Sequence, residues 1–148
     1  YCSSLGSINL PNRVKTIGKR AFDGCSSLSH IELPQSLLSI EMEAFGDCIS
    51  LNEIVIPNSV VRIESYAFLQ STVATVRIGN GVTSIGSGVF DGCYKLQYIY
   101  CSAITPPILG SSAIPTSVGI IYVPRESVEE YRALWNDFAN KIAAYDFE

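Results

Sequence analysis

The chain has one histidine, His30, and this is the residue best suited to acid–base chemistry. Glu32 follows two positions later, and Glu53 stands at the place of His30 in the next copy of a repeat described below. A His–carboxylate pair can catalyse only with a nucleophile in reach, but the recurring serines fall on expected turns and the recurring cysteines should point inward. We therefore interpret His30 as a surface residue and predict no catalytic residue. A hydrolase is the function that the sequence favours least.

The chain has five cysteines, so at least one of them is unpaired. Four recur at one position of the repeat, namely Cys2, Cys25, Cys48 and Cys93. Thiolates at that spacing would form a line, whereas zinc needs four converging ligands, usually with C-x-x-C clustering. We predict no metal site and no cofactor, and expect Cys25, Cys48 and Cys93 to be buried, reduced thiols that fill space in the core. The state of Cys2 and Cys101 is left open.

The recurring positions define the pattern C-x-x-L-x-x-I-x-L-P-x-x-V-x-x-I-x-x-x-A-F, with a period of 23 residues that shortens to 22 around residues 71–79. Successive copies begin at Cys2, Cys25, Cys48, Ser71 and Cys93, and the fifth copy diverges after Cys101. A unit of this length cannot enclose a core alone, but stacked units can share one. We therefore predict a solenoid of five to six coils, in which equivalent residues lie over one another.

Each copy should contain one strand, a second edge and a turn. The I-x-L element alternates inward and outward, so it predicts short strands that pair in parallel from coil to coil, with Ile31, Ile54, Val76 and Ile99 aligned. The proline ends the strand, V-x-x-I starts a second edge, and A-F-x-x-C predicts a compact and partly helical turn. The later segment IIYVP adds a sixth strand, with Ile121 and Val123 inward.

The last part of the chain predicts a helical cap. Ser127 and Glu130 have the spacing of a capping box, and an apolar face at helical spacing follows, made of Val128, Tyr131, Leu134, Trp135 and Phe138. That face can cover the open end of a solenoid, which would otherwise invite aggregation. We predict one domain, with the solenoid at residues 1–124 and its C-terminal cap at 125–148. Because the chain begins inside a repeat, we expect it to be a fragment of a longer repeat protein.

The stretch LNEIVIPNSVVRIESYAFLQS resembles the unit of the BspA-like leucine-rich repeat family almost throughout, and the ending PPILGSSAI to IIYVPRESVEEYRALWNDF resembles that family's terminal segment. The resemblance implies an α/β fold, a right-handed leucine-rich-repeat solenoid with one parallel β-sheet, short helical turns and a C-terminal helical cap. It also implies a secreted or cell-surface protein of bacteria, or of certain mucosal protists, with a role in adhesion or host interaction. The family provides no catalytic motif, so function transfers only as a class.

Charge and composition exclude two classes of partner. The net charge of −4 and the pI near 5.0 do not favour a polyanion, so we predict no nucleic-acid binding. Residues 96–124 form an uncharged run, but its prolines and glycines would break a spanning helix, so we predict no membrane insertion by this segment. The first residues show no signal peptide.

The outward strand positions form the exposed face of the predicted sheet and do not serve the core. On the last two strands they are Tyr98, Tyr100, Ile120 and Tyr122, a composition that protein and carbohydrate interfaces favour. We predict that this patch binds a protein or glycan partner on a host or neighbouring cell surface. Two alternatives remain open: the cap or the loop at 105–117 covers the patch, or the chain is a passive spacer or stalk.

Overall fold

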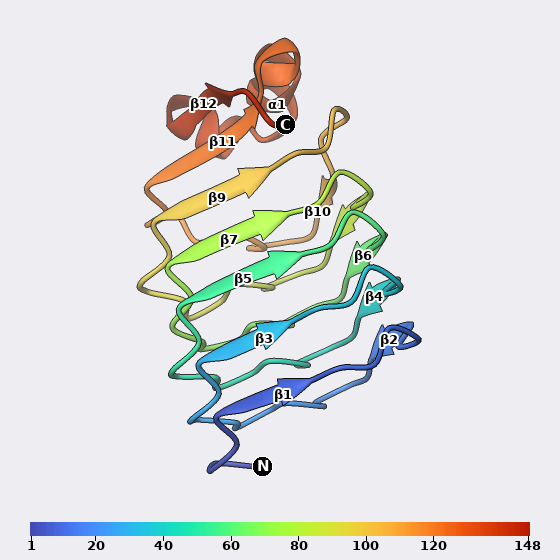
Figure 1. The fold of residues 1–148 in the computed structure, drawn as a ribbon. Coiled ribbons are helices and arrows are strands. Elements are labelled where there is room, and N and C mark those ends of the chain that lie inside the picture. Colours follow the sequence, from blue (N-terminus) through green and yellow to red (C-terminus); the bar gives the residue numbers. More distant parts are fainter.

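The I-x-L element of every copy forms a short strand, and these strands stack in parallel up one side of a right-handed solenoid (Figure 1). The computed structural model describes residues 1–148. The strands are β1 (Ser7–Asn9), β3 (His30–Glu32), β5 (Glu53–Ile56), β7 (Thr75–Ile78), β9 (Tyr98–Cys101) and β11 (Ile120–Pro124). Ile54, Val76, Ile99 and Ile121 are register partners on successive strands, which confirms the predicted alignment there. β1 pairs with β3, whereas β3 and β5 are neighbours without ladder pairing.

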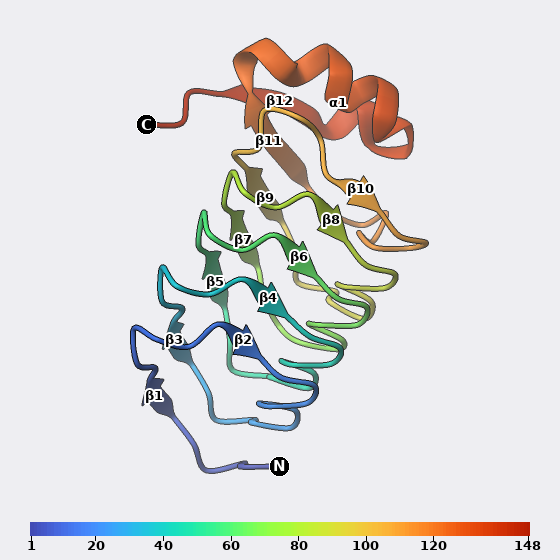
Figure 2. The same ribbon diagram turned by 90° about the vertical axis from the view of Figure 1, so that its right-hand side faces the viewer.

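The second edge of each coil is also a strand, so the prediction of a single sheet was incomplete. β2 (Thr16–Ile17), β4 (Ser39–Ile40), β6 (Arg62–Ile63), β8 (Ser84–Ile85) and β10 (Ile108–Leu109) form a second parallel ladder (Figure 2). Coils of nearly equal length bring the V-x-x-I segments into register, and in the first four of these strands the isoleucine side chain points into the core. Two residues per coil are enough to extend the ladder.

The A-F-x-x-C segment is a series of tight turns and contains no helix, contrary to the partly helical turn that we predicted. Each turn closes with hydrogen bonds between residues three apart, such as the Asp23 amide to the Arg20 carbonyl. The first residue of that turn has a positive φ in four coils, at Arg20, Glu43, Tyr66 and Gly88. A left-handed residue at this point prevents the backbone from continuing as an α-helix.

Columns of like residues fill the core. Phe22, Phe45, Phe68 and Phe90 stack with ring centroids 5.2, 5.2 and 5.5 Å apart. Cys25, Cys48 and Cys93 are buried and form no disulfide, as predicted, and burial raises the pKa of the Cys48 and Cys93 thiols to about 12. The remaining two cysteines are also free, Cys2 exposed and Cys101 buried.

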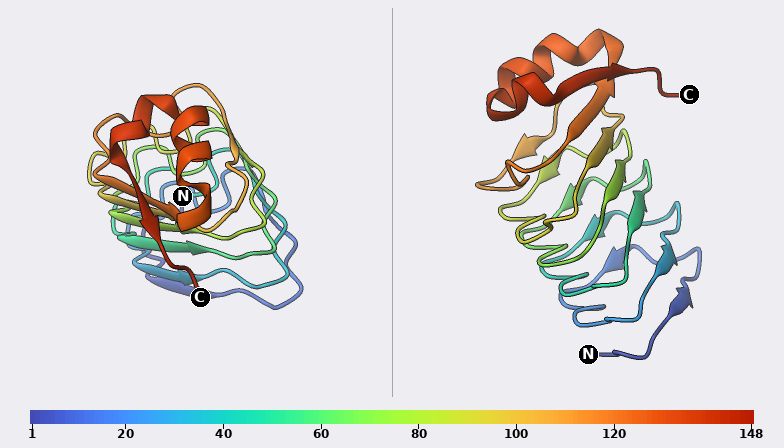
Figure 3. Two further views of the ribbon diagram at one scale, coloured as in Figure 1. Left: turned by 90° about the horizontal axis from the view of Figure 1, so that it is seen from above. Right: turned by 90° about the vertical axis from the view of Figure 1, so that its left-hand side faces the viewer.

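The C-terminal segment forms a 3₁₀ turn η1 (Arg125–Ser127), a helix α1 (Val128–Leu134), a second 3₁₀ segment η2 (Asn136–Lys141) and a strand β12 (Ile142–Tyr145). Seen from above, the helical part lies over the end of the coil stack (Figure 3). β12 pairs in parallel with β11 and so extends the main ladder, a strand that the sequence did not lead us to expect.

Two details of the predicted cap were wrong. The Ser127 side chain makes no capping hydrogen bond. Ser127 is the last residue of η1, so its backbone φ and ψ angles are already helical before α1 begins. Leu134 is 62% exposed, since the helix ends there and its side chain lies at the edge of the apolar stripe. The other members of the predicted face do pack on the solenoid: Tyr131, Trp135 and Phe138 are buried, and Val128 is half-buried.

Hydrogen bonds fasten this segment to the last coil, and two of them come from buried aromatic side chains. The Tyr131 hydroxyl donates to the Ala103 carbonyl at 2.7 Å, and the Trp135 indole donates to the Pro107 carbonyl at 2.9 Å. Burial raises the pKa of the Tyr131 hydroxyl, which therefore remains protonated and able to donate.

Candidate functional site: an aromatic surface on the main sheet

The structure brings the four predicted binding residues together on two paired strands. Ile120 is the register partner of Tyr98, and Tyr122 is the partner of Tyr100. Their neighbours Ile99 and Ile121 are buried, so strand alternation turns all four outward. Tyr98 is 42% exposed, and the other three are half-buried.

The tyrosine rings stack between neighbouring strands. The centroids of Tyr100 and Tyr122 are 4.7 Å apart, and those of Tyr98 and Tyr122 are 6.5 Å apart, each pair with its planes within 22°. This stacking follows from the register, because outward residues on paired strands are held at close to the strand spacing. The rings therefore turn their faces toward one another.

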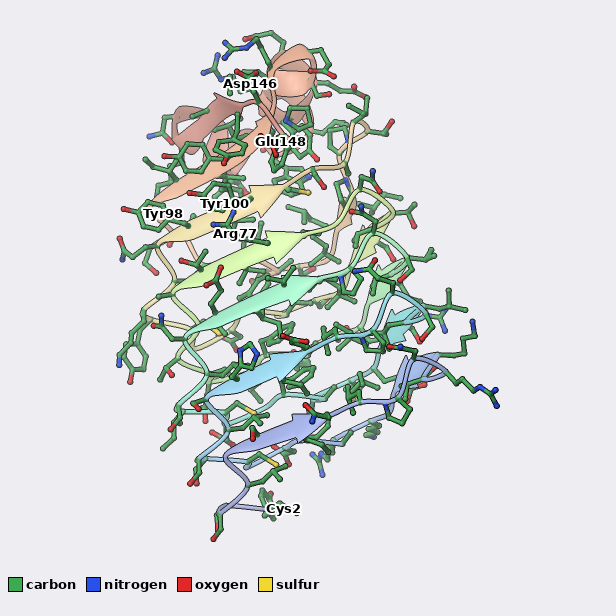
Figure 4. All side chains as sticks on the ribbon, viewed as in Figure 1. Cys2, Arg77, Tyr98, Tyr100, Asp146 and Glu148 are labelled. Carbon is green, nitrogen blue, oxygen red and sulfur yellow. The ribbon has the colours of Figure 1, made fainter.

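Arg77 continues the same row on β7, where it is the register partner of Tyr100. Its guanidinium lies 4.2 Å from the centroid of the Tyr100 ring, and its Nε donates to a Glu53 carboxylate oxygen at 3.0 Å. Figure 4 shows Arg77, Tyr98 and Tyr100 on one face of the sheet. The candidate site predicted from the sequence did not include Arg77. The predicted alignment of the strands at residues 75–78 and 98–101 places Arg77 beside Tyr100, and it could have been used to add Arg77 to the site.

β12 and the residues after it add two further aromatic side chains, Tyr145 and Phe147, that the sequence analysis did not predict. The Tyr145 ring lies 5.1 Å from Tyr100 and 5.6 Å from Tyr122, centroid to centroid, and Phe147 lies 4.8 Å from Tyr145. Tyr145 remains 39% exposed, so the C-terminal segment extends the patch as well as flanking it. The sequence analysis could have placed Tyr145 in the candidate site only if it had predicted that residues 142–145 form a strand beside β11. We refer to Arg77, Tyr98, Tyr100, Ile120, Tyr122, Tyr145 and Phe147 as the aromatic surface.

The tyrosine hydroxyls of the aromatic surface have no hydrogen-bond partner within the protein, in contrast to buried Tyr131. The rim is polar. Arg125 binds Asp146 through two hydrogen bonds of 3.0 Å, and this guanidinium holds the pKa of the Asp146 carboxyl below its usual range. An aromatic centre with free hydroxyls and a charged rim has the anatomy of a protein interface.

His30 lies outside this surface, at an exposed position beside Glu32. Its Nε2 is 3.6 Å from a Glu32 carboxylate oxygen with both side chains largely exposed, and Glu53 is bound to Arg77 instead. No three His, Cys, Asp or Glu side chains gather closely enough to hold a metal ion. Nor does any helix combine the length and the apolar character needed to cross a membrane.

Coils of 22 to 23 residues, with inward aliphatic side chains on a parallel ladder, define a leucine-rich-repeat solenoid, an architecture that provides extended surfaces for protein interaction. The chain belongs to the family of the BspA type leucine rich repeat region, which matches residues 1–113 in six copies. The resemblance noted in the sequence is therefore confirmed.

Solved structures of bacterial leucine-rich repeat proteins share the fold. The T. pallidum leucine-rich repeat protein TpLRR is 29% identical with a TM-score of 0.64, over 90% of this chain and 72% of its own. A leucine-rich repeat protein from Bacteroides ovatus is 25% identical with a TM-score of 0.60, over 82% of this chain and 40% of its own. The pneumococcal vaccine antigen PcpA is 23% identical with a TM-score of 0.69, and the match covers 95% of this chain and 36% of the PcpA chain. No curated protein sequence matches the chain significantly.

Proposed function

We propose that the chain is a non-enzymatic interaction module of a secreted or cell-surface bacterial protein, and that it holds an adhesion partner on the exposed face of its main sheet. The observation that carries the proposal is the aromatic surface, where stacked tyrosines stand outward with free hydroxyls. None of these side chains is required to close the core, because the inward residues of β9 and β11 already do so.

A protein partner fits this surface better than a glycan does. A sugar that binds to tyrosine rings stacks on their exposed faces, but here Tyr122 occupies one side of the Tyr100 ring and the Arg77 guanidinium lies over that ring. The exposed edges and hydroxyls suit hydrogen bonds to peptide groups and polar side chains. Tyr and Arg are also the residue types that most often anchor protein interfaces.

The solenoid at 1–124 and the segment at 125–148 act as one domain in this proposal. β11 and β12 each supply a tyrosine to the aromatic surface, so the binding face runs across the boundary between the two parts. The cell-surface location is proposed from the family.

Binding to an array of extracellular matrix and cell-surface proteins tests the proposal. Tyr98→Ala is the most informative variant, because Tyr98 is well exposed and its nearest ring centroid is 6.5 Å away. We expect it to weaken binding by about 1 to 2 kcal/mol while the melting temperature stays nearly constant. Tyr94→Ala is the matched control, because Tyr94 is 71% exposed and lies outside the aromatic surface.

Two outcomes contradict the proposal. Unchanged binding in folded Tyr98→Ala, or a loss confined to Tyr94→Ala, would place the interface elsewhere. No binding to any arrayed protein, with the wild-type chain folded, would favour a passive spacer.

A further inference from the structure

A cleft of about 560 Å³ lies beside the C-terminal helical segment and shares no residue with the aromatic surface. One wall, residues 109–117, runs from the end of β10 through the loop that follows it, and the other, residues 134–138, runs from the end of α1 into η2. Asp91, from the turn of the preceding coil, completes the lining. The volume is within the range of small-ligand sites, about 300 to 1,000 Å³.

The two walls of the cleft are fixed to the rest of the molecule and to each other. The Trp135 indole donates to the Pro107 carbonyl at 2.9 Å, and the Lys141 ammonium donates to the Thr116 carbonyl and, at 2.7 Å, to the Val118 carbonyl. Trp135 and Phe138 are both buried against the solenoid. The cleft is therefore preformed, which lowers the entropic cost of binding a ligand there.

The polar side chains of the cleft make no hydrogen bonds within the protein, which sets them apart from the hydroxyls of the repeat. In the repeat, hydroxyls donate to a backbone carbonyl 22 to 26 residues earlier and so tie one coil to another, as seen at Ser26, Ser29, Ser36, Ser50, Ser59, Ser71, Thr83 and Ser102. No such bond involves the cleft side chains Asp91, Ser111, Ser112, Thr116, Ser117, Asn136 and Asp137. These side chains are exposed, so their polar groups are available to a ligand.

The cleft also has an apolar strip and an uncompensated negative charge. Leu134 lines it and is 62% exposed, and Leu109 lies on the opposite wall. Asp91 and Asp137 take part in no ion pair, while Lys141 directs its ammonium to backbone carbonyls. These features suit a ligand that offers several hydroxyl donors and a C–H face and carries no negative charge of its own.

We propose that this cleft binds a neutral saccharide unit. The carboxylates of Asp91 and Asp137 accept hydrogen bonds from sugar hydroxyls, Asn136 and the serine and threonine hydroxyls both donate and accept, and Leu134 packs against the C–H face of the ring. The two carboxylates repel acidic sugars. The site is independent of the aromatic surface and of the partner proposed for it.

Trp135 provides the readout, because it is the only tryptophan in the chain and it lines the cleft. We would titrate the full chain with the methyl glycosides of glucose, galactose, mannose and N-acetylglucosamine and with their oligosaccharides, following tryptophan fluorescence and saturation-transfer NMR. The expected result is saturable binding of at least one neutral sugar and none of glucuronic acid. Asp91→Ala and Asp137→Ala should each weaken that binding about tenfold or more, as expected for loss of a hydrogen bond to a charged group.

Asp23→Ala is the matched control, because Asp23 follows Phe22 as Asp91 follows Phe90, in a turn outside the cleft. This variant should bind as the wild type does, and the melting temperatures of all three variants show whether they are folded. The proposal is overturned if no neutral saccharide binds saturably, or if binding is unchanged in folded Asp91→Ala and Asp137→Ala. Binding of a lysine-rich peptide in place of any sugar would likewise overturn it and identify a site for cations.

Discussion

The cysteine column of the repeat contributes hydrogen bonds to the core as well as volume. The Cys48 and Cys93 thiols donate to the carbonyls of Phe22 and Phe68. Ser71, which takes the place of cysteine in the fourth copy, donates in the same way to the Phe45 carbonyl and also accepts from the Cys48 amide. The sequence predicts only a space-filling role for the column, whereas Cys48, Ser71 and Cys93 each also donate to the Phe carbonyl of the preceding coil.

Ser71 provides a test of this role. Ser71→Cys should be nearly neutral, because the column already accommodates a thiol donor at this place. Ser71→Ala should lower the free energy of unfolding by about 1 to 3 kcal/mol, since it leaves the buried Phe45 carbonyl and Cys48 amide without that partner. Urea unfolding of both variants measures the difference. Equal stability of the two would mean that the hydrogen bonds contribute nothing and that only volume matters.

The buried thiols also make stability depend on alkaline pH. The pKa of Cys48 and of Cys93 rises from 9.0 to about 12 on folding, so the unfolded chain loses these protons first. The folded state therefore holds more protons above pH 9, and its stability should fall as the pH rises from about 9 toward 12. Denaturant unfolding between pH 8 and 10.5 measures this slope. Cys48→Ser should show a shallower decline, and an identical decline in that variant would show that other groups cause it.

The elements that the sequence predicts well are those that the repeat specifies. The outward alternation of I-x-L on six strands follows from repetition, because equivalent positions share one environment. The second ladder was harder to predict, since two residues such as Ser84 and Ile85 show no alternation. β12 contains the segment IAAY, which lacks both the repeat and a strong strand preference, so Tyr145 and its part in the candidate site escaped prediction.

The docking of α1 and η2 rests on Trp135 far more than on its neighbour Leu134. Trp135 is 3% exposed and hydrogen-bonds Pro107, whereas Leu134 is 62% exposed. Trp135→Ala should cost about 3 to 5 kcal/mol, as expected for a large buried aromatic side chain, and Leu134→Ala less than about 0.5 kcal/mol. Thermal unfolding of this adjacent pair separates packing from exposure. A comparable loss in both variants would mean that Leu134 packs against the solenoid in solution.

The C-terminal segment closes one end of a core that otherwise runs without interruption along the stack. The phenylalanine column and the inward strand residues form a single cluster with Tyr131, Trp135, Phe138 and Ile142. β12 also pairs with the outer edge of β11, whose backbone groups would otherwise be free. We therefore expect the coils and this segment to unfold together in a single transition.

Deleting residues 125–148 tests this dependence. The remaining chain, residues 1–124, would expose the β11 edge, the apolar end of the core and the carbonyls of Ala103 and Pro107 that Tyr131 and Trp135 now bind. We expect it to melt at a lower temperature than the full chain and to associate, because an open strand edge beside an exposed apolar surface promotes self-pairing. Light scattering and circular dichroism on both chains at equal concentration measure the two effects. A truncated chain that stays monomeric and melts at the temperature of the full chain would show that the solenoid is stable alone, and residues 125–148 would then be a separate unit resting on its end.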